Sequence, residues 1–267
     1  MLPEATVRFC RAVRYNQKSM KVSVILPAAG LGTRMGASST STAPVLPGLE
    51  KPGASRKQFL ILDGSPILVH TIRKFASVPV VTEIVVALRG DDLAWAEDLL
   101  RGEHLGKPVR LVEGGDSRHE SVEHAVASLA PDTDLVAVHD AVRPFIEPHL
   151  VEQVIAEAAE HGAAIVGIVP VDTVKRVQKN LIRSTLPREH LVLAQTPQVF
   201  RYDLLKAAFA KANEDNFTGT DESSLVERLE QVDVRVVQGS DRNIKITRPG
   251  DLDLARLFLA EEKALAR

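Results

Sequence analysis

The residues best suited to chemistry lie in a loop that directly follows an apolar run near the start of the chain. Residues 22–26 are followed by Pro-Ala-Ala-Gly-Leu-Gly-Thr-Arg-Met-Gly, which ends at Gly36. Glycine and alanine let backbone N–H groups approach an anion closely, and a loop that opens a helix adds the positive end of the helix dipole. Arg34 adds a permanent, forked cation. The pattern predicts a strand that leads into a phosphate-binding loop.

Two better-known nucleotide-binding loops do not match this segment. A dinucleotide fingerprint requires G-x-G-x-x-G, but Gly30, Gly32 and Gly36 are spaced G-x-G-x-x-x-G. A Walker loop would need a lysine after Gly53, where Ala54 stands. For the loop taken alone, a glycine-rich turn without a ligand stays an alternative.

Three further segments carry residues that could join this loop. Lys57, in Arg-Lys-Gln-Phe, brings a cation, with an ordinary surface lysine as the alternative. Residues 113–121 place two glycines before polar residues, which suits bonds to a base edge or, equally, a tight turn with a helix cap. Asp140 ends a buried apolar run and can hold a hard cation such as Mg²⁺, while Arg143 can clamp a phosphate. The alternative for this pair is a simple salt bridge.

Other kinds of site are excluded by spacing. His119 and His124 diverge by about 140° on a helix and cannot share one face, unlike the histidines of a zinc helix. The chain has no G-x-S-x-G elbow, so nucleophilic catalysis has no support.

Near the C-terminal end of the chain, Lys245 and Thr247 share one face of an alternating segment whose isoleucines face the core.

Apolar, β-branched runs alternate with helical patterns and must position these residues. We expect strands at residues 22–26, 83–88, 109–112, 135–139, 164–169, 232–237 and 243–247. Helix starts are predicted at Ser65-Pro66, Asp91-Asp92, Thr220-Asp221-Glu222 and Pro249. This alternation predicts an α/β fold with a Rossmann-like, doubly wound, mostly parallel sheet. The loops after Leu26, Val112, His139 and Thr247 should then converge on one crevice at the carboxyl ends of the strands.

Two segments interrupt the alternation. Residues 37–55 are rich in serine, threonine, proline and glycine, and we expect a flexible loop. Residues 171–193 are polar, mixed in charge and lack a helical stripe. They predict a protruding arm, and an arm too small to have its own core should pack on a partner.

Composition limits the remaining possibilities. The chain has 267 residues and a formal net charge of −2, so one full core can form and no global charge favours nucleic acid. No apolar run reaches the about 18 residues that span a bilayer, and no membrane association is expected. The single cysteine, Cys10, excludes an internal disulfide and predicts a reducing, cytoplasmic location. Residues 1–20 are expected to be a disordered extension, with plastid import as the alternative, and residues 21–267 a single domain.

Eight short motifs, in this order, resemble those of the 2-C-methyl-D-erythritol 4-phosphate cytidylyltransferases, the IspD family of nucleotidyltransferases. They are P-A-A-G-L-G-T-R-M at 27–35, K-Q-F at 57–59, G-G-D-S-R at 114–118, H-D-A-V-R-P at 139–144, D-T-V-K-R at 172–176, Q-T-P-Q-V-F at 195–200, T-D-E at 220–222 and N-I-K-I-T-R-P at 243–249. The resemblance implies a GT-A-like fold with a protruding β-arm. It also implies transfer of CMP from CTP to methylerythritol phosphate, with release of pyrophosphate, in the non-mevalonate isoprenoid pathway.

The resemblance also implies roles for individual residues. Arg34, Lys57 and Lys245 would surround the triphosphate as catalytic groups, and Asp140 would hold Mg²⁺. The residues implied for CTP binding are Pro27, Ala28, Ala29, Gly30, Gly32, Gly115, Asp116, Ser121, Asp140 and Ala141. Arg143, Thr196 and Thr220 would face methylerythritol phosphate, and the arm of a homodimer partner would add Thr173 and Arg188.

The sequence departs from the family pattern between the loop and Lys57. Family members have only a few residues there, whereas here residues 37–55 intervene and Arg56 replaces a proline. Lys57 must therefore be positioned in the site by the C-terminal end of this long loop, and we expect CTP binding to order the loop. The alternatives to the implied function are a ribitol 5-phosphate cytidylyltransferase and a non-catalytic nucleotide-binding regulator.

Overall fold

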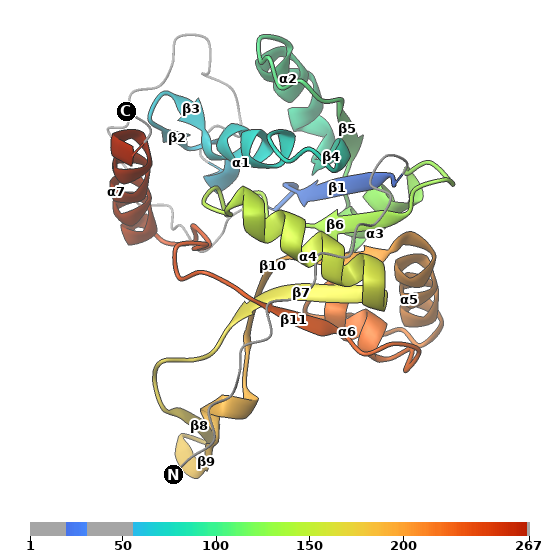
Figure 1. Cartoon of the computed structure of the whole chain (residues 1–267), viewed down its shortest axis with the longest axis vertical. Coiled ribbons are helices and arrows are strands. Elements are labelled where there is room, and N and C mark those ends of the chain that lie inside the picture. Colours follow the sequence, from blue (N-terminus) through green and yellow to red (C-terminus); the bar gives the residue numbers. More distant parts are fainter. Residues whose placement is uncertain (1–19, 31–55, 266–267) are drawn as a thin grey trace, which may run out of the picture.

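The computed structural model describes residues 20–30 and 56–265, which are built around a seven-stranded sheet (Figure 1). The strands are β1 (Val22–Pro27), β2 (Ile61–Leu62), β3 (Ser65–Pro66), β4 (Val81–Leu88), β5 (Val109–Glu113), β6 (Leu135–Val138), β7 (Ala163–Ile168), β8 (Val174–Gln178), β9 (Leu181–Leu186), β10 (Leu193–Arg201) and β11 (Arg235–Gln238). The helices are α1 (Ile67–Ala76), α2 (Gly90–Arg101), α3 (Arg118–Ala127), α4 (Pro148–His161), α5 (Tyr202–Glu214), α6 (Glu222–Glu227) and α7 (Pro249–Leu265), with short 3-10 turns η2 (Lys57–Phe59) and η3 (Arg188–His190).

The large sheet is mixed and mostly parallel, which confirms the predicted fold class. Its strand order is β5-β4-β1-β6-β10-β7-β11, and only β10 runs antiparallel to its neighbours, β6 and β7. The sequence analysis did not predict β10. Pro197 interrupts its apolar pattern, and the register with β7 shifts between Ala194 and Gln198, where that proline lies.

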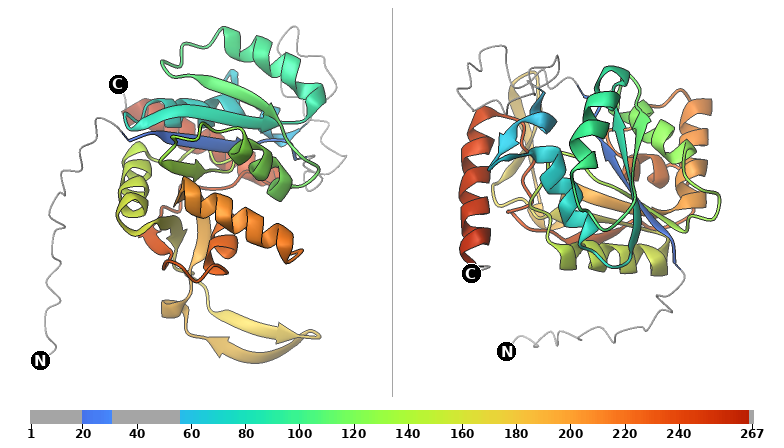
Figure 2. Two further views of the ribbon diagram at one scale, coloured as in Figure 1. Left: turned by 90° about the vertical axis from the view of Figure 1, so that its right-hand side faces the viewer. Right: turned by 90° about the horizontal axis from the view of Figure 1, so that it is seen from above.

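Both faces of the sheet are buried, as the unbroken apolar runs predicted. Helices α1, α2 and α4 cover one face and α3, α5 and α6 the other (Figure 2). Along β1, Val24 and Leu26 point into the first layer and Ile25 into the second, because successive side chains of a strand alternate between faces. All three side chains are fully buried.

Three predicted details of secondary structure are wrong. Ser65 is not a helix cap but pairs in the β2–β3 hairpin, where Asp63 and Gly64 have φ of 50° and 81°, as a two-residue turn of this kind requires. The strand predicted at 232–237 begins later, as β11. Residues 243–247 form no strand, because Asn243 donates to the Thr196 carbonyl at 2.9 Å and the Ile246 N–H donates to Val142 at 3.0 Å instead of joining a ladder.

A second hairpin, β8–β9, occupies most of the segment predicted as an arm. Its tight turn uses Lys179 and Asn180, both with positive φ, and it extends away from the layered body in Figures 1 and 2. Its apolar side chains are exposed, with Leu181 at 58% and Ile182 at 66%. Within the described residues, no helix is long and apolar enough to cross a membrane.

The strand order places a topological switch point between β1 and β6. After β1, the chain adds β4 and β5 on one side and then returns to add β6 on the other side of β1. Loops that leave neighbouring strands in opposite directions open a crevice at the carboxyl ends of those strands, where ligands bind in doubly wound sheets. The fold therefore assigns a position to the site before any side chain is considered.

Candidate active site

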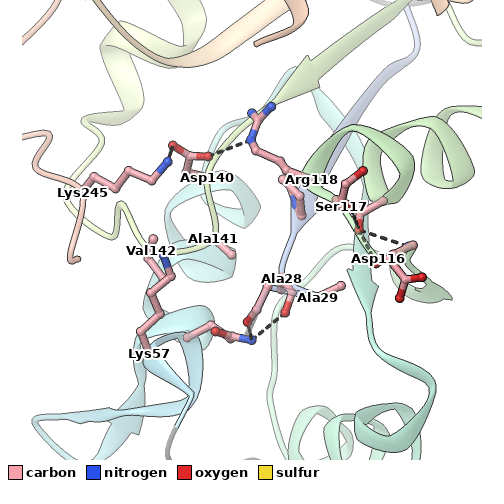
Figure 3. Close-up of a pocket in the computed structure, with 15 residues that line it drawn as sticks. Ala28, Ala29, Lys57, Asp116, Ser117, Arg118, Asp140, Ala141, Val142 and Lys245 are labelled. Atoms are coloured by element: carbon pink, nitrogen blue, oxygen red, sulfur yellow. Dashed lines mark hydrogen bonds and ion pairs between the residues drawn. The ribbon is translucent and has the colours of Figure 1, made fainter. Parts of the chain in front are cut away.

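A pocket opens at the carboxyl ends of β1 and β6, at this switch point (Figure 3). It is lined by Pro27, Ala28, Ala29, Gly30, Lys57, Gln58, Gly115, Asp116, Ser117, Arg118, Ser121, Asp140, Ala141, Val142 and Lys245. Three of the four loops predicted to converge, those after Leu26, Val112 and His139, contribute to it; the loop after Thr247 does not, although Lys245 just before it does. Every described residue predicted to bind CTP lies in this lining, together with Lys57 and Lys245, whereas Gly32 and Arg34 lie outside the described residues, as does the 37–55 loop.

The first wall is the chain that leaves β1. The Ala28 N–H donates to the Ala87 carbonyl at 2.8 Å, and Ala28 and Ala29 are nearly buried. The Gln58 amide donates to the carbonyls of Ala28, at 2.6 Å, and Gly30, at 3.3 Å. Since small side chains leave the backbone open and Gln58 fixes its course, this wall can approach a planar base or a phosphate closely.

The second wall is the turn that leads into α3, where a capping box fixes the helix start. The Ser117 hydroxyl accepts from the Glu120 N–H at 3.1 Å, and the Glu120 carboxylate accepts from the Ser117 N–H at 3.4 Å and also from the Asp116 N–H at 2.8 Å. The Ser121 hydroxyl accepts from the Gly115 N–H at 3.1 Å and therefore supports the turn from below. A Cβ on Gly115 would lie 2.3 Å from that of Glu120, so only glycine fits there.

Asp140 is the electrostatic centre of the pocket. Its carboxylate contacts Lys245 at 2.8 Å, Arg118 at 3.2 Å and Arg143 at 3.3 Å (Figure 3 draws the first two). Burial alone would raise the pKa of Asp140, but Arg118, Lys245 and Arg143 outweigh it and hold that pKa well below its usual range. Asp140 is therefore ionised near neutral pH. Lys245 and Arg118 approach it from opposite sides, and both line the pocket.

A buried polar layer supports Asp140 from behind. The Thr196 hydroxyl accepts from the Asp140 N–H at 3.0 Å and lies 3.2 Å from His139 Nδ1. His139 is fully buried, with its other ring nitrogen 3.0 Å from the Arg143 carbonyl, and burial lowers the pKa of His139 to about 4. His139 is thus neutral near neutral pH, and this layer adds no charge to the site.

Two participants were missed by the sequence analysis. Arg118 donates to both carboxylate oxygens of Glu222, at 2.6 and 2.9 Å, and the Glu222 side chain is 2% exposed. Burial would lower the pKa of Arg118, but Glu222 and Asp140 raise it above its ordinary value. Both residues stand at helix starts, α3 and α6, within motifs already noted. Nothing in the sequence indicated that Arg118 and Glu222, 104 positions apart, form an ion pair beside Asp140 at the end of β6.

The residues predicted to face the acceptor are not gathered in this pocket. Arg143 and Thr196 are largely buried behind Asp140, where they bond to it rather than to open space. Thr220 is exposed just before α6, Thr173 is exposed just before β8, and Arg188 donates to a backbone carbonyl at the base of the hairpin. Within one chain the structure therefore brings together the described residues predicted to bind the nucleotide, but not those predicted to face the acceptor.

The donor set limits how a metal could bind. Among the described residues, no group of three or more histidine, cysteine, aspartate or glutamate side chains could enclose an ion. The hard carboxylate of Asp140 does face the pocket, and Mg²⁺ is commonly held by one or two carboxylates together with substrate phosphates and water. Among the described residues, Asp140 is therefore the carboxylate best placed to hold a cation that arrives with a nucleotide.

The switch-point pocket, the small-residue wall and the cations around one buried carboxylate define an α/β nucleotide-binding enzyme of the phosphoryl-transfer type. Residues 22–261 match the family model described as "IspD: 2-C-methyl-D-erythritol 4-phosphate cytidylyltransferase". The chain belongs to this family and is a cytidylyltransferase.

Individual relatives agree with this assignment. The chain is 60% identical to the 2-C-methyl-D-erythritol 4-phosphate cytidylyltransferase of Solibacter usitatus, over 92% of this chain and 98% of that protein. It is 48% identical to the enzyme of that name from Acidobacterium capsulatum, over 92% of this chain and 100% of the relative. Among solved structures, 4-diphosphocytidyl-2C-methyl-D-erythritol synthase from Anaerococcus prevotii superposes with a TM-score of 0.76 at 28% identity, covering 90% of this chain and 96% of that one.

Proposed function

We propose that the switch-point pocket is where this chain transfers CMP from CTP to 2-C-methyl-D-erythritol 4-phosphate. A phosphate oxygen of the acceptor attacks the α-phosphorus of CTP, a new P–O bond forms, and the bond to the β-phosphate breaks with loss of pyrophosphate. No covalent enzyme intermediate is needed, so catalysis consists of positioning and charge stabilisation. The observation that carries this proposal is the set of cations converging on Asp140 beside an open backbone wall.

The two walls are suited to the nucleoside. Gly115 on the second wall and the nearly buried Ala28 and Ala29 on the first leave room for a flat base between them. Asp116 lies beside Gly115 on the second wall. We assign the cytosine and ribose to this side. The triphosphate then lies toward Lys57 and Lys245, whose charges offset the negative charge that grows on the leaving pyrophosphate.

Lys245 is held in place before the nucleotide binds. Its ammonium lies 2.8 Å from the Asp140 carboxylate, which is itself fixed by two arginines. A preorganised cation needs little reorganisation when charge develops. Mg²⁺, when bound beside Asp140, would neutralise and orient the phosphate oxygens. Arg34, which lies outside the described residues, has the same assigned role as Lys57.

The hairpin supports a second part of the proposal, a homodimer with shared sites. Its exposed apolar side chains, including Val177 and Ile182, would be covered by a partner, and it carries Thr173 and Arg188, which have no place in the pocket of their own chain. We assign these two residues to the acceptor pocket of the partner. A cytoplasmic location, expected from the single cysteine, completes the proposal.

Pyrophosphate release tests the proposed reaction. The chain, CTP and Mg²⁺ are incubated with methylerythritol phosphate in one reaction and ribitol 5-phosphate in another. Release with the first acceptor alone is expected. Release with ribitol 5-phosphate alone, or with neither, would overturn the proposal. The R188A variant should keep its dimeric mass in light scattering but lose activity, and full activity in a confirmed dimer would refute the shared site.

A further inference from the structure

The turn that carries Lys57 is anchored on both sides of that residue. On one side, the Arg56 guanidinium forms an ion pair with Asp92. On the other, Gln58 donates to two carbonyls of the β1 wall, and the buried Phe59 ring lies edge-on to Trp95 with centroids 4.5 Å apart. Lys57 therefore sits between two fixed points.

The Arg56 anchor is partly buried rather than exposed at the surface. The Asp92 side chain is 3% exposed and the Arg56 side chain 15%, so water screens their interaction little. Asp92 lies in the first turn of α2, where the helix dipole also favours a negative charge. An ion pair in this setting holds its partners in one geometry, unlike a solvated surface pair.

Arg56 also starts the turn through its backbone. The Phe59 N–H donates to the Arg56 carbonyl at 2.9 Å, which closes the single 3-10 turn that contains Lys57. Any shift of Arg56 therefore changes the direction in which Lys57 leaves the chain. Lys57 lines the pocket, and the described chain resumes only one residue before it, at Arg56.

We propose that Arg56 is a positioning residue, whose ion pair with the buried Asp92 fixes the start of the η2 turn and so places the Lys57 ammonium in the pocket. This inference rests on the proposed function, in which Lys57 stabilises the triphosphate. It assigns a purpose to an arginine where the family pattern has a proline. The pair joins the end of a long inserted segment directly to α2.

The test compares R56A, K57A and the R56A/K57A double variant by kcat for pyrophosphate release. Because a misplacement of about 1 Å can cost on the order of 10²-fold, we expect R56A to lower kcat by roughly 10- to 100-fold. In the K57A background, the same change should cost less than about twofold, because the group that Arg56 positions is absent. R101A is the matched control, since Arg101 pairs with Asp98 on the same helix, at 3.1 Å and with both side chains exposed.

A spectroscopic measurement reports the turn itself. Trp95 is the single tryptophan of the chain and contacts Phe59, so its emission should shift in R56A and stay unchanged in R101A. R56Q, which keeps most of the side chain's length without its charge, serves if R56A does not fold, and the same non-additivity with K57A is expected.

The outcomes separate the two proposals. Unchanged kcat in R56A, or an equal loss with and without Lys57, would overturn the positioning role while leaving the reaction intact. Absence of pyrophosphate release from the wild-type chain would instead overturn the proposed function. In that case the Trp95 emission still tests whether the Arg56–Asp92 ion pair fixes the η2 turn. Unchanged emission in R56A would refute that role of Arg56.

Discussion

Replacement of Glu222 by glutamine removes one negative charge from the buried cluster beneath the pocket while keeping the size of the side chain. In the native protein, Arg118, Arg143 and Lys245 face the two carboxylates of Asp140 and Glu222. In E222Q, the three cations would share Asp140 alone. Arg118 loses the most electrostatic stabilisation, because both of its terminal nitrogens bond to the Glu222 carboxylate.

The expected loss of stability follows from burial. Glu222 is 2% exposed, and removing one partner of a buried ion pair costs about 3–5 kcal/mol because the other charge is left uncompensated. Glutamine still accepts one bond from Arg118, so we expect about 2–3 kcal/mol. A domain is stable by only about 5–15 kcal/mol, so this single charge is a large fraction of the total.

Urea unfolding followed by Trp95 emission measures the change. E261Q is the matched control, since Glu261 pairs with Arg242 at 2.7 Å but is 46% exposed, and its loss should cost no more than about 1 kcal/mol. If E222Q and E261Q lowered the free energy of unfolding equally, the electrostatic account of the cluster would be refuted.

Three further predictions concern the pocket and its supports. K245A should lower kcat for pyrophosphate release by about 10²- to 10³-fold through loss of a preorganised cation, and a kcat within a few fold of wild type would remove Lys245 from the mechanism. The buried His139 has its pKa lowered from 6.5 to about 4, so the unfolded chain binds its proton first and stability is lost as pH falls. Between about pH 7 and pH 5 the wild-type chain should therefore lose about 2 kcal/mol more free energy of unfolding than H139N, and parallel pH profiles would contradict this. S117A removes the helix cap of α3 and should cost about 1 kcal/mol in urea unfolding, with no change expected for S77A, whose hydroxyl bonds only a carbonyl at the exposed end of α1.

Several elements were predictable because their local pattern matched their final environment. Strands β1, β4, β6 and β7 are mostly apolar runs, and such a run is stable only where helices cover both faces. The residues at their ends, including Asp140 and Ala28, could be identified because small or charged residues interrupt an otherwise apolar sequence.

Other features depend on neighbours that are remote in sequence. Strand β10 contains Pro197 and is a strand only because β6 and β7 supply partners on both sides. Residues 243–247 alternate like a strand, but Asn243 ties them to the Thr196 carbonyl and no ladder forms. The local sequence pattern cannot predict which of these segments becomes a strand. The free energy that stabilises a strand comes from its pairing with neighbouring strands, which are remote in sequence.

The sequence by itself determined the fold class, and it predicted a phosphate-binding loop after β1 and the charged residues able to act on a triphosphate. Only the tertiary structure decided how those charges are paired. Arg143 faces Asp140 from within the core, Arg118 joins it to Glu222, and Arg56 reaches Asp92 across 36 positions. The physical reason is that a buried charged side chain is held in place by an opposite charge close to it in the low-dielectric interior. Only folding brings two such residues, which are remote in sequence, close together.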